Sequence, residues 1–155
     1  MRIEVQQACF DPGERLNQLH ADQLGVGAVV GFVGYVRDYN DGDPVAGMWL
    51  EHYPGMTEKA LAGIVEQAMA RWPLLDVQVL HRVGQLDPGE PIVFVGVASA
   101  HRQAAFEANA FIMDYLKTRA PFWKRESTPK GERWVEARDS DELALSRWKT
   151  DQSER

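Results

Sequence analysis

Two spacings of apolar residues alternate along the chain, one typical of β-strands and the other of α-helices. Short stretches in which apolar and polar positions alternate, or in which apolar residues run together, are bounded by Gly, Pro and Asp and predict strands. Ile92–Ala98 is a continuous apolar run and predicts a central strand, whereas Gly27–Val36 predicts a buried strand and Arg2–Ala8 an edge strand. The other predicted strands are Val45–His52, Leu75–Val83, Phe122–Glu126 and Arg133–Ala137.

Helical spacing appears between these strands, with residues that favour helix ends beside it. Asp11 is a favourable N-cap residue and Pro12 suits the first helical position. Ser99 is expected to cap a long helix, which Ala120 and Pro121 end. The predicted helices are Asp11–Leu24, Thr57–Trp72, Ala100–Arg119 and Asp139–Lys149. A loop is expected over Asp38–Pro44 and a turn at Asp87–Gly89.

Interleaved strands and helices place the chain in the α/β or α+β class. Its 155 residues, 45% of them hydrophobic, fit one domain over residues 1–150, and residues 151–155 are expected to be a frayed tail. A single cysteine, Cys9, cannot form an internal disulfide. The N-terminus lacks the apolar run of a signal peptide, and no stretch approaches the roughly 20 residues of a membrane span. We therefore expect a cytoplasmic protein.

Charge is distributed unevenly along the chain. The formal net charge is -6, which disfavours a general nucleic-acid-binding protein because phosphate binding requires a basic face. Residues 101–138 nevertheless contain eight Lys or Arg and five Asp or Glu side chains, so this stretch is net positive. A local positive field on an acidic protein favours a confined anion site. The alternative is an ordinary solvated charged surface.

Basic side chains occupy both ends of the predicted long helix. His101 and Arg102 lie in its first turn, where free backbone N–H groups favour a bound anion. The alternative is that both side chains reach solvent or pair with a carboxylate. Lys117 lies at the border of the apolar face near the other end, about 22 Å away along the axis. It either extends to solvent or, if partly desolvated, has a lowered pKa that suits a base or nucleophile.

Two further segments are candidates for ligand binding. In the segment PFWKRE, alternation places Phe122, Lys124 and Glu126 on one face of a strand and Trp123 and Arg125 on the other. Aromatic residues interleaved with basic ones also suit single-stranded nucleic acid, although the run is short. In the segment GYVR, a strand runs into a loop, a frequent place for ligands in α/β proteins. Its basic residue, at position 37, either binds a ligand there or pairs with a neighbouring aspartate.

Several common enzyme signatures are missing from the sequence. His52 and His81 have no partners at metal-ligand spacing and are expected to be structural. Cys9 has no neighbouring base, and there is no P-loop or GxGxxG motif. Scattered Lys, Arg and His without these signatures favour proton transfer on an anionic substrate. We expect neither a metal nor a cofactor.

Four segments, in this order, resemble the catalytic, large subunit of molybdopterin synthase. They are LEHYPGMTEKA at residues 50–60, GVASAHR at 96–102, FIMDYLKTRAPFWKRE at 111–126 and RWVEAR at 133–138. The similarity covers roughly residues 25 to 148 and is specific because the segments occur together. It implies an α/β hammerhead fold with a small additional antiparallel β subdomain.

The resemblance also implies a reaction and partners. The substrate would be cyclic pyranopterin monophosphate (precursor Z), which receives two sulfurs to form the dithiolene of molybdopterin. Each sulfur would arrive as the C-terminal thiocarboxylate of a small ubiquitin-like carrier subunit that ends in Gly-Gly. The implied assembly is a heterotetramer, in which a homodimer of large subunits carries one small subunit at each end.

Matching positions imply the site residues. Lys117 and Lys124 correspond to the two active-site lysines of the family. The implied substrate-binding residues are Tyr35, Val36, Arg37, His101, Arg102, Lys117, Lys124, Arg125, Glu126 and Arg138. Tyr35 stands where a lysine or small polar residue is expected, so a backbone contact is the expectation there. Arg138 is implied to reach a pocket across the dimer, and Arg102 need not meet Lys117 of its own chain if the pocket lies between subunits.

The two lysines are expected to play different roles. Partial desolvation at the helix border favours proton exchange or nucleophilic attack by Lys117, and the side chain could also hold the carrier carboxylate; the sequence does not decide whether Lys117 is a base, a nucleophile or a clamp. Lys124 is expected to stabilise developing negative charge. Two other classes remain: a non-catalytic scaffold that binds a partner through its sheet, and a small RNA-binding module that uses Trp123, Lys124 and Arg125.

Overall fold

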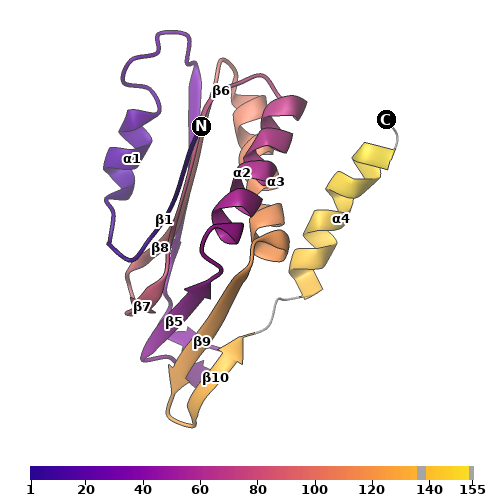
Figure 1. The fold of residues 1–155 in the computed structure, drawn as a ribbon. Coiled ribbons are helices and arrows are strands. Elements are labelled where there is room, and N and C mark those ends of the chain that lie inside the picture. Colours follow the sequence, from indigo (N-terminus) through magenta and orange to yellow (C-terminus); the bar gives the residue numbers. More distant parts are fainter. Residues whose placement is uncertain (136–138, 154–155) are drawn as a thin grey trace.

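A computed structural model describes residues 1–135 and 139–153, and its main feature is a four-stranded sheet covered by helices on both faces (Figure 1). The strand order is β1 (Arg2–Gln6), β6 (Leu74–Arg82), β8 (Pro91–Ser99) and β2 (Ala28–Tyr35). β1 and β6 are parallel, and the other two pairs are antiparallel. The short helix α1 (Pro12–Gln18) lies on one face, and the helices α2 (Met56–Arg71) and α3 (Arg102–Arg119) lie on the other.

The central position of β8 is confirmed, because it pairs on both sides and eight of its nine residues are buried. Its alternating side chains fill two cores, with Val93, Val95 and Val97 toward α2 and α3 and Phe94 toward α1. The prediction that the strand at Gly27–Val36 is buried, in contrast, is wrong for β2. It lies at the sheet edge with three residues exposed, because only β8 pairs with it.

α1 and α3 begin differently from each other. Asp11 caps α1 as predicted, its carboxylate accepting the Gly13 N–H at 3.0 Å, but the helix ends earlier than expected, at Gln18. The expected cap at Ser99 is wrong, since β8 continues through this residue and its hydroxyl donates to the Pro73 carbonyl. α3 therefore begins at Arg102, with His101 as an N-cap that makes no side-chain bond.

A second, smaller antiparallel sheet confirms the expected additional subdomain and the α+β class. Its order is β10 (Gly131–Val135), β9 (Phe122–Thr128), β5 (Gly47–His52) and β7 (Gly84–Leu86), of which β7 was not predicted. The segment expected to be a loop forms the short hairpin β3 (Tyr39–Asn40) and β4 (Asp43–Pro44). Asp41 and Gly42 between them have φ angles of 51° and 82°, as a two-residue hairpin turn requires.

The C-terminal helix α4 (Asp139–Ser153) packs against α3 and continues four residues beyond the predicted end. Trp148 packs edge-on against Trp72 and Phe111, and its indole N–H donates to Asp114 at 2.7 Å. The guanidinium of Arg71 lies 5.0–5.5 Å from the same three rings. The boundary between a domain at 1–150 and a frayed tail stays a prediction. Over the described residues, no helix has both the length and the apolar character needed to span a bilayer.

One glycine holds the start of β2 against the start of α3. Gly27 donates its N–H to the Ser99 carbonyl at 3.0 Å, and a Cβ at this position would lie 2.1 Å from the carbonyl oxygen of Ala100. Since backbone must move to relieve such a contact, Gly27→Ala is expected to lower the free energy of unfolding by about 1–3 kcal/mol.

Urea unfolding would measure this loss against Gly63→Ala, the matched control in α2, where an added Cβ meets nothing within 4 Å. In the control, the free energy of unfolding is expected to rise by roughly 0.5–1 kcal/mol, because alanine is more favourable than glycine in a helix interior. Equal stability of the two variants would contradict the close approach at Gly27.

Candidate active site

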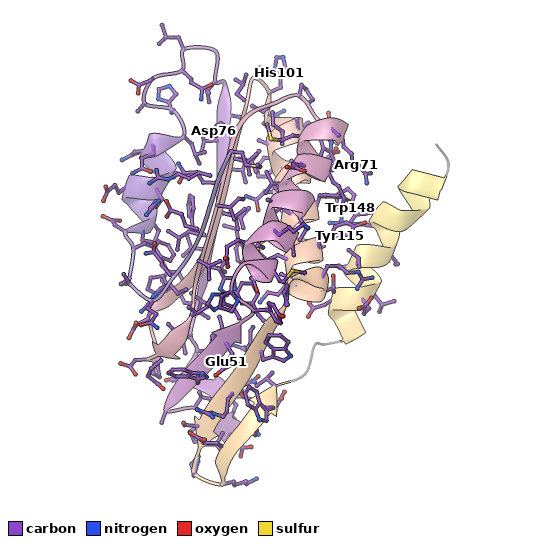
Figure 2. All side chains as sticks on the ribbon, in the orientation of Figure 1. Glu51, Arg71, Asp76, His101, Tyr115 and Trp148 are labelled. Atoms are coloured by element: carbon purple, nitrogen blue, oxygen red, sulfur yellow. The ribbon has the colours of Figure 1, made fainter. Side chains whose placement is uncertain are left out.

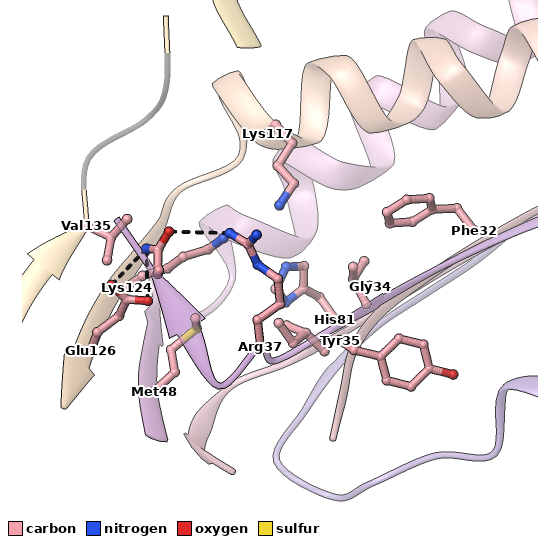
Figure 3. A pocket seen from close by; sticks show the side chains of 13 residues that line it. Phe32, Gly34, Tyr35, Arg37, Met48, His81, Lys117, Lys124, Glu126 and Val135 are labelled. Atoms are coloured by element: carbon pink, nitrogen blue, oxygen red, sulfur yellow. Dashed lines mark hydrogen bonds between the residues drawn. The ribbon is translucent and has the colours of Figure 1, made fainter. Parts of the chain in front are cut away.

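A cavity of about 290 Å³ lies where the large sheet, the small sheet and the C-terminal end of α3 meet (Figure 3). Lys117 reaches it from the last turn of α3, and Lys124 and Glu126 reach it from alternate positions of β9. Arg37 enters from the loop that follows β2. The remaining lining residues are Phe32, Gly34, Tyr35, Asn40, Met48, His81, Ile92, Val93 and Val135.

Five of the predicted site residues therefore meet at one cavity, although they come from distant parts of the chain. These residues are Tyr35, Arg37, Lys117, Lys124 and Glu126. Figure 3 shows Lys117 directed toward the guanidinium of Arg37 and the amine of Lys124. Three cationic groups around a small volume make a site for an anionic ligand.

Lys124 is the lysine whose titration the fold alters. Burial and, to a smaller extent, the nearby charge of Lys117 together lower the pKa of its amine to about 8. Lys117 itself is exposed, because the final turn of α3 turns it toward the cavity mouth. Partial desolvation was expected at Lys117, but in the structure the lysine that burial affects is Lys124. A neutral amine at Lys124 is accessible near neutral pH and can accept a proton.

His81 was predicted to be structural, yet it lines the cavity from the end of β6. Its ring is buried and stacks on Phe122 with the ring centroids 3.9 Å apart. Nδ1 lies 2.9 Å from the Arg82 carbonyl oxygen, which can only accept, so Nδ1 carries the hydrogen and Nε2 is the acceptor. Burial lowers the pKa of His81 to about 3, with Lys124 and Lys117 acting in the same direction. The sequence feature that could have indicated this position is the single histidine among the apolar alternate residues of the predicted strand Leu75–Val83.

The neutral state of His81 predicts a loss of stability in acid. Below the unfolded pKa of 6.5 the unfolded chain binds a proton that the folded chain, with a pKa of about 3, does not bind. Stability is therefore lost as the pH falls through this interval, by about 2 kcal/mol between pH 7 and pH 5. Urea unfolding of wild type and His81→Gln at both pH values would measure the difference. Equal pH dependence in the two proteins would show that His81 does not contribute.

Asn40 is a cavity residue that the sequence reasoning missed within the expected loop. Its side-chain nitrogen donates to both carboxylate oxygens of Glu126, at 3.0 and 3.1 Å, and its side-chain oxygen accepts from Arg37 at 3.3 Å. Asn40 and Glu126 are both buried, and 86 residues separate them in the chain. No local pattern in the sequence indicates this pairing.

Two predicted residues lie beside the cavity without lining it. Arg125 is on the opposite face of β9, between the rings of Trp49 and Trp134, and forms an ion pair with Glu132. The strand alternation places it there, so its side chain does not enter the cavity that Lys124 lines. Val36 is buried in the core of the small sheet, and its N–H donates to the Glu90 carbonyl.

Three other predicted residues are not brought to the cavity by this chain. His101 and Arg102 lie at the opposite end of α3 from Lys117, about 22 Å away along the helix axis. Figure 2 shows His101 at one end of the molecule, whereas Glu51 marks the small sheet at the other. Arg138 lies outside the described residues.

Comparison with known proteins places this geometry in a family. Residues 5–119 match the family model described as MoaE protein. A relative from Pseudomonas aeruginosa, named molybdopterin synthase catalytic subunit, is 70% identical over 148 residues, which cover 96% of this chain and 99% of that protein.

Solved structures agree with the sequence matches. The molybdopterin biosynthesis MoaE protein from Burkholderia ambifaria is 52% identical, with a TM-score of 0.81 over 95% of this chain and 97% of that chain. A chain at 20% identity shares the fold with a TM-score of 0.73 over 88% of this chain and 91% of its own; it comes from a complex of subunits 1 and 2 of molybdopterin-converting factor from Helicobacter pylori. The extent of the family match and the 70% identity show that the chain belongs to the MoaE family of molybdopterin synthase catalytic subunits, enzymes of molybdenum cofactor biosynthesis.

Proposed function

We propose that the chain transfers sulfur from the C-terminal thiocarboxylate of a small carrier subunit to cyclic pyranopterin monophosphate, forming the dithiolene of molybdopterin. The observation that carries the proposal is the convergence of Arg37, Lys117 and Lys124 on one cavity of about 290 Å³. The substrate phosphate and the thiocarboxylate are both anions, and charge-assisted hydrogen bonds from Arg37 and Lys117 suit them. Membership of a family of molybdopterin synthase catalytic subunits supports the proposal.

Each side chain has a role that follows from its position. Arg37 binds the substrate phosphate, and the exposed ammonium of Lys117 holds the carrier terminus at the cavity mouth. The thiocarboxylate sulfur attacks a pterin side-chain carbon that bears an oxygen of the cyclic phosphate. A C–S bond forms as this C–O bond breaks, so the phosphate ring opens, its oxygen leaves as a phosphate oxyanion still attached to the side chain, and the carrier stays joined to the pterin as a thioester. Water then cleaves the acyl–sulfur bond and leaves a carboxylate on the carrier, while the neutral amine of Lys124 accepts the proton released by that water. A second carrier delivers the second sulfur.

We also propose that the working unit is a homodimer with one carrier bound to each chain. The cavity of one chain is at the small end of the range for ligand sites, and His101 and Arg102 lie too far from it to contribute within the same chain. A second copy that brings these side chains to the cavity would complete the phosphate site. Sedimentation of the pure chain at micromolar concentration, with and without carrier, tests this assembly. A chain that stays monomeric and does not bind the carrier would contradict the proposed assembly.

The two rival functions have weaker support. The aromatic and basic run that favoured RNA divides between two faces, since Lys124 turns into the cavity whereas Arg125 and Trp123 face outward. A scaffold function does not require a lysine whose pKa burial lowers to about 8 inside a cationic cavity.

Reconstitution tests the proposed function directly. The purified chain is mixed with thiocarboxylated carrier and cyclic pyranopterin monophosphate, and dithiolene product is quantified. We expect product only when all three components are present and the carrier is thiocarboxylated. Absence of product from the complete mixture, with carrier binding intact, would favour the scaffold. Tight RNA binding with a steep salt dependence would favour the nucleic-acid function instead.

A further inference from the structure

Arg37 is connected to the buried carboxylate of Glu126 through an amide instead of directly. Asn40 lies between them and is hydrogen-bonded to both. The Glu126 carboxylate can only accept, so the two bonds from Asn40 identify its nitrogen as the atom on that side. The amide oxygen must then face Arg37, whose guanidinium nitrogen donates to it at 3.3 Å.

Arg133 of β10 holds Glu126, the residue at the other end of this series of hydrogen bonds. Its guanidinium contacts Glu126 at 3.4 Å and Asp43 at 2.9 Å, and it also donates to the Asn40 backbone carbonyl at 2.9 Å. Arg133 therefore attaches the β3–β4 hairpin to the small sheet at Asn40 and at Asp43. Glu126 is 3% exposed, and a buried carboxylate with this many donors is held in one position.

An amide between the two charged groups has an electrostatic consequence. Arg37 forms no ion pair with any residue in the described ranges 1–135 and 139–153, so its charge stays available to an incoming anion. Direct pairing with Glu126 would orient the guanidinium equally well but would neutralise it. The amide supplies the orientation, while Arg133 balances the charge of Glu126.

We infer that Asn40 is a positioning residue, which holds Arg37 in a geometry fixed by Glu126 and so directs a guanidinium that has no ion pair among residues 1–135 and 139–153 at the phosphate of the pterin substrate. The inference rests on the proposed function for the identity of the ligand. Its geometric part, the ordering of Arg37 by Asn40, does not depend on turnover.

A double-mutant cycle of Arg37→Ala and Asn40→Ala tests the inference. In wild type, Asn40→Ala is expected to raise KM for cyclic pyranopterin monophosphate roughly 3- to 10-fold, the effect of one lost hydrogen bond, with kcat changed less than about 2-fold. In the Arg37→Ala background, Asn40→Ala is expected to change KM by less than about 2-fold, because the residue it positions is gone. If the KM increase in the double variant equals the product of the increases in the two single variants, the inference is overturned.

Asn40→Asp is a second variant that keeps the shape of the side chain. Its carboxylate would pair with Arg37 but could no longer donate to Glu126, whose oxygens lie 3.0 and 3.1 Å from the atom that is replaced. KM is therefore expected to rise further than in Asn40→Ala, and the free energy of unfolding is expected to fall. A wild-type KM in this variant would overturn the argument that an uncharged partner is required. Asn109→Ala is the matched control, since it removes another buried amide, one that donates to the Val30 and Val95 carbonyls away from the cavity. It is expected to lower stability and leave KM unchanged.

A readout without turnover separates this inference from the proposed function. The Nε–Hε signal of Arg37 in heteronuclear relaxation measurements is expected to report an ordered side chain in wild type and a mobile one in Asn40→Ala. An equally ordered Arg37 in the variant would overturn the positioning role. An ordered-to-mobile change in a protein that forms no dithiolene would retain the positioning role and reject the proposed function.

Discussion

Replacing Lys124 by arginine is expected to reduce dithiolene formation at least ~100-fold, the lower end of what a general acid–base group contributes. The burial that lowers the pKa of Lys124 to about 8 makes a neutral amine accessible, whereas a guanidinium stays protonated in proteins. The substitution keeps the positive charge and adds bulk to a small cavity. Lys117→Arg, at an exposed position whose role is a charge, is expected to lose less than about 10-fold.

Single-turnover product formation, with carrier affinity and unfolding curves measured alongside, tests this difference. Lys130→Arg is the matched control, because its side chain is 80% exposed on the β9–β10 turn and away from the cavity. The wild-type rate is expected to rise with pH and level off above about 8, since the required form of Lys124 is the neutral one. Near-normal turnover in Lys124→Arg would assign Lys124 to electrostatic stabilisation alone.

Removing the two terminal glycines from the carrier is expected to abolish turnover, even when the shortened carrier is thiocarboxylated. The cavity holds about 290 Å³, and the exposed aromatic side chains of Phe32 and Tyr35 line its approach. We expect a slender extended segment to pass them and place its terminus near Lys117, because glycine permits the closest backbone approach. A shortened tail would leave the sulfur outside the cavity.

Three carriers make this test specific: the full-length thiocarboxylate, the shortened thiocarboxylate, and a full-length form with valine in place of the penultimate glycine. Product formation and association with the chain are measured for each. We expect the valine form to bind more weakly than full length and to react slowly, because its side chain meets the narrow entrance. Equal turnover with the shortened carrier would reject a tail that enters the cavity.

Local features of this protein were predictable from the sequence because their causes lie within a few residues. The apolar arc of α3 is buried as its spacing indicated, with Ala108, Phe111 and Ile112 inaccessible to solvent. Asp11 caps α1 through its own carboxylate, and the apolar run of β8 becomes the centre of the large sheet. The cationic cluster was predicted residue by residue through the family resemblance, and Arg37, Lys117 and Lys124 do meet.

Other features depended on contacts between distant segments and were decided only by the tertiary structure. Alternation showed that Lys124 and Arg125 face opposite ways, but it did not show that Lys124 is the buried lysine. How α3 meets the small sheet decides this, and burial lowers the pKa of Lys124 to about 8, whereas the side chain of Lys117 is exposed. The bond between Asn40 and Glu126 joins residues 86 positions apart, which no local pattern encodes. The sequence by itself determined which residues carry charge, and packing determined which of those charges are altered, oriented or left available.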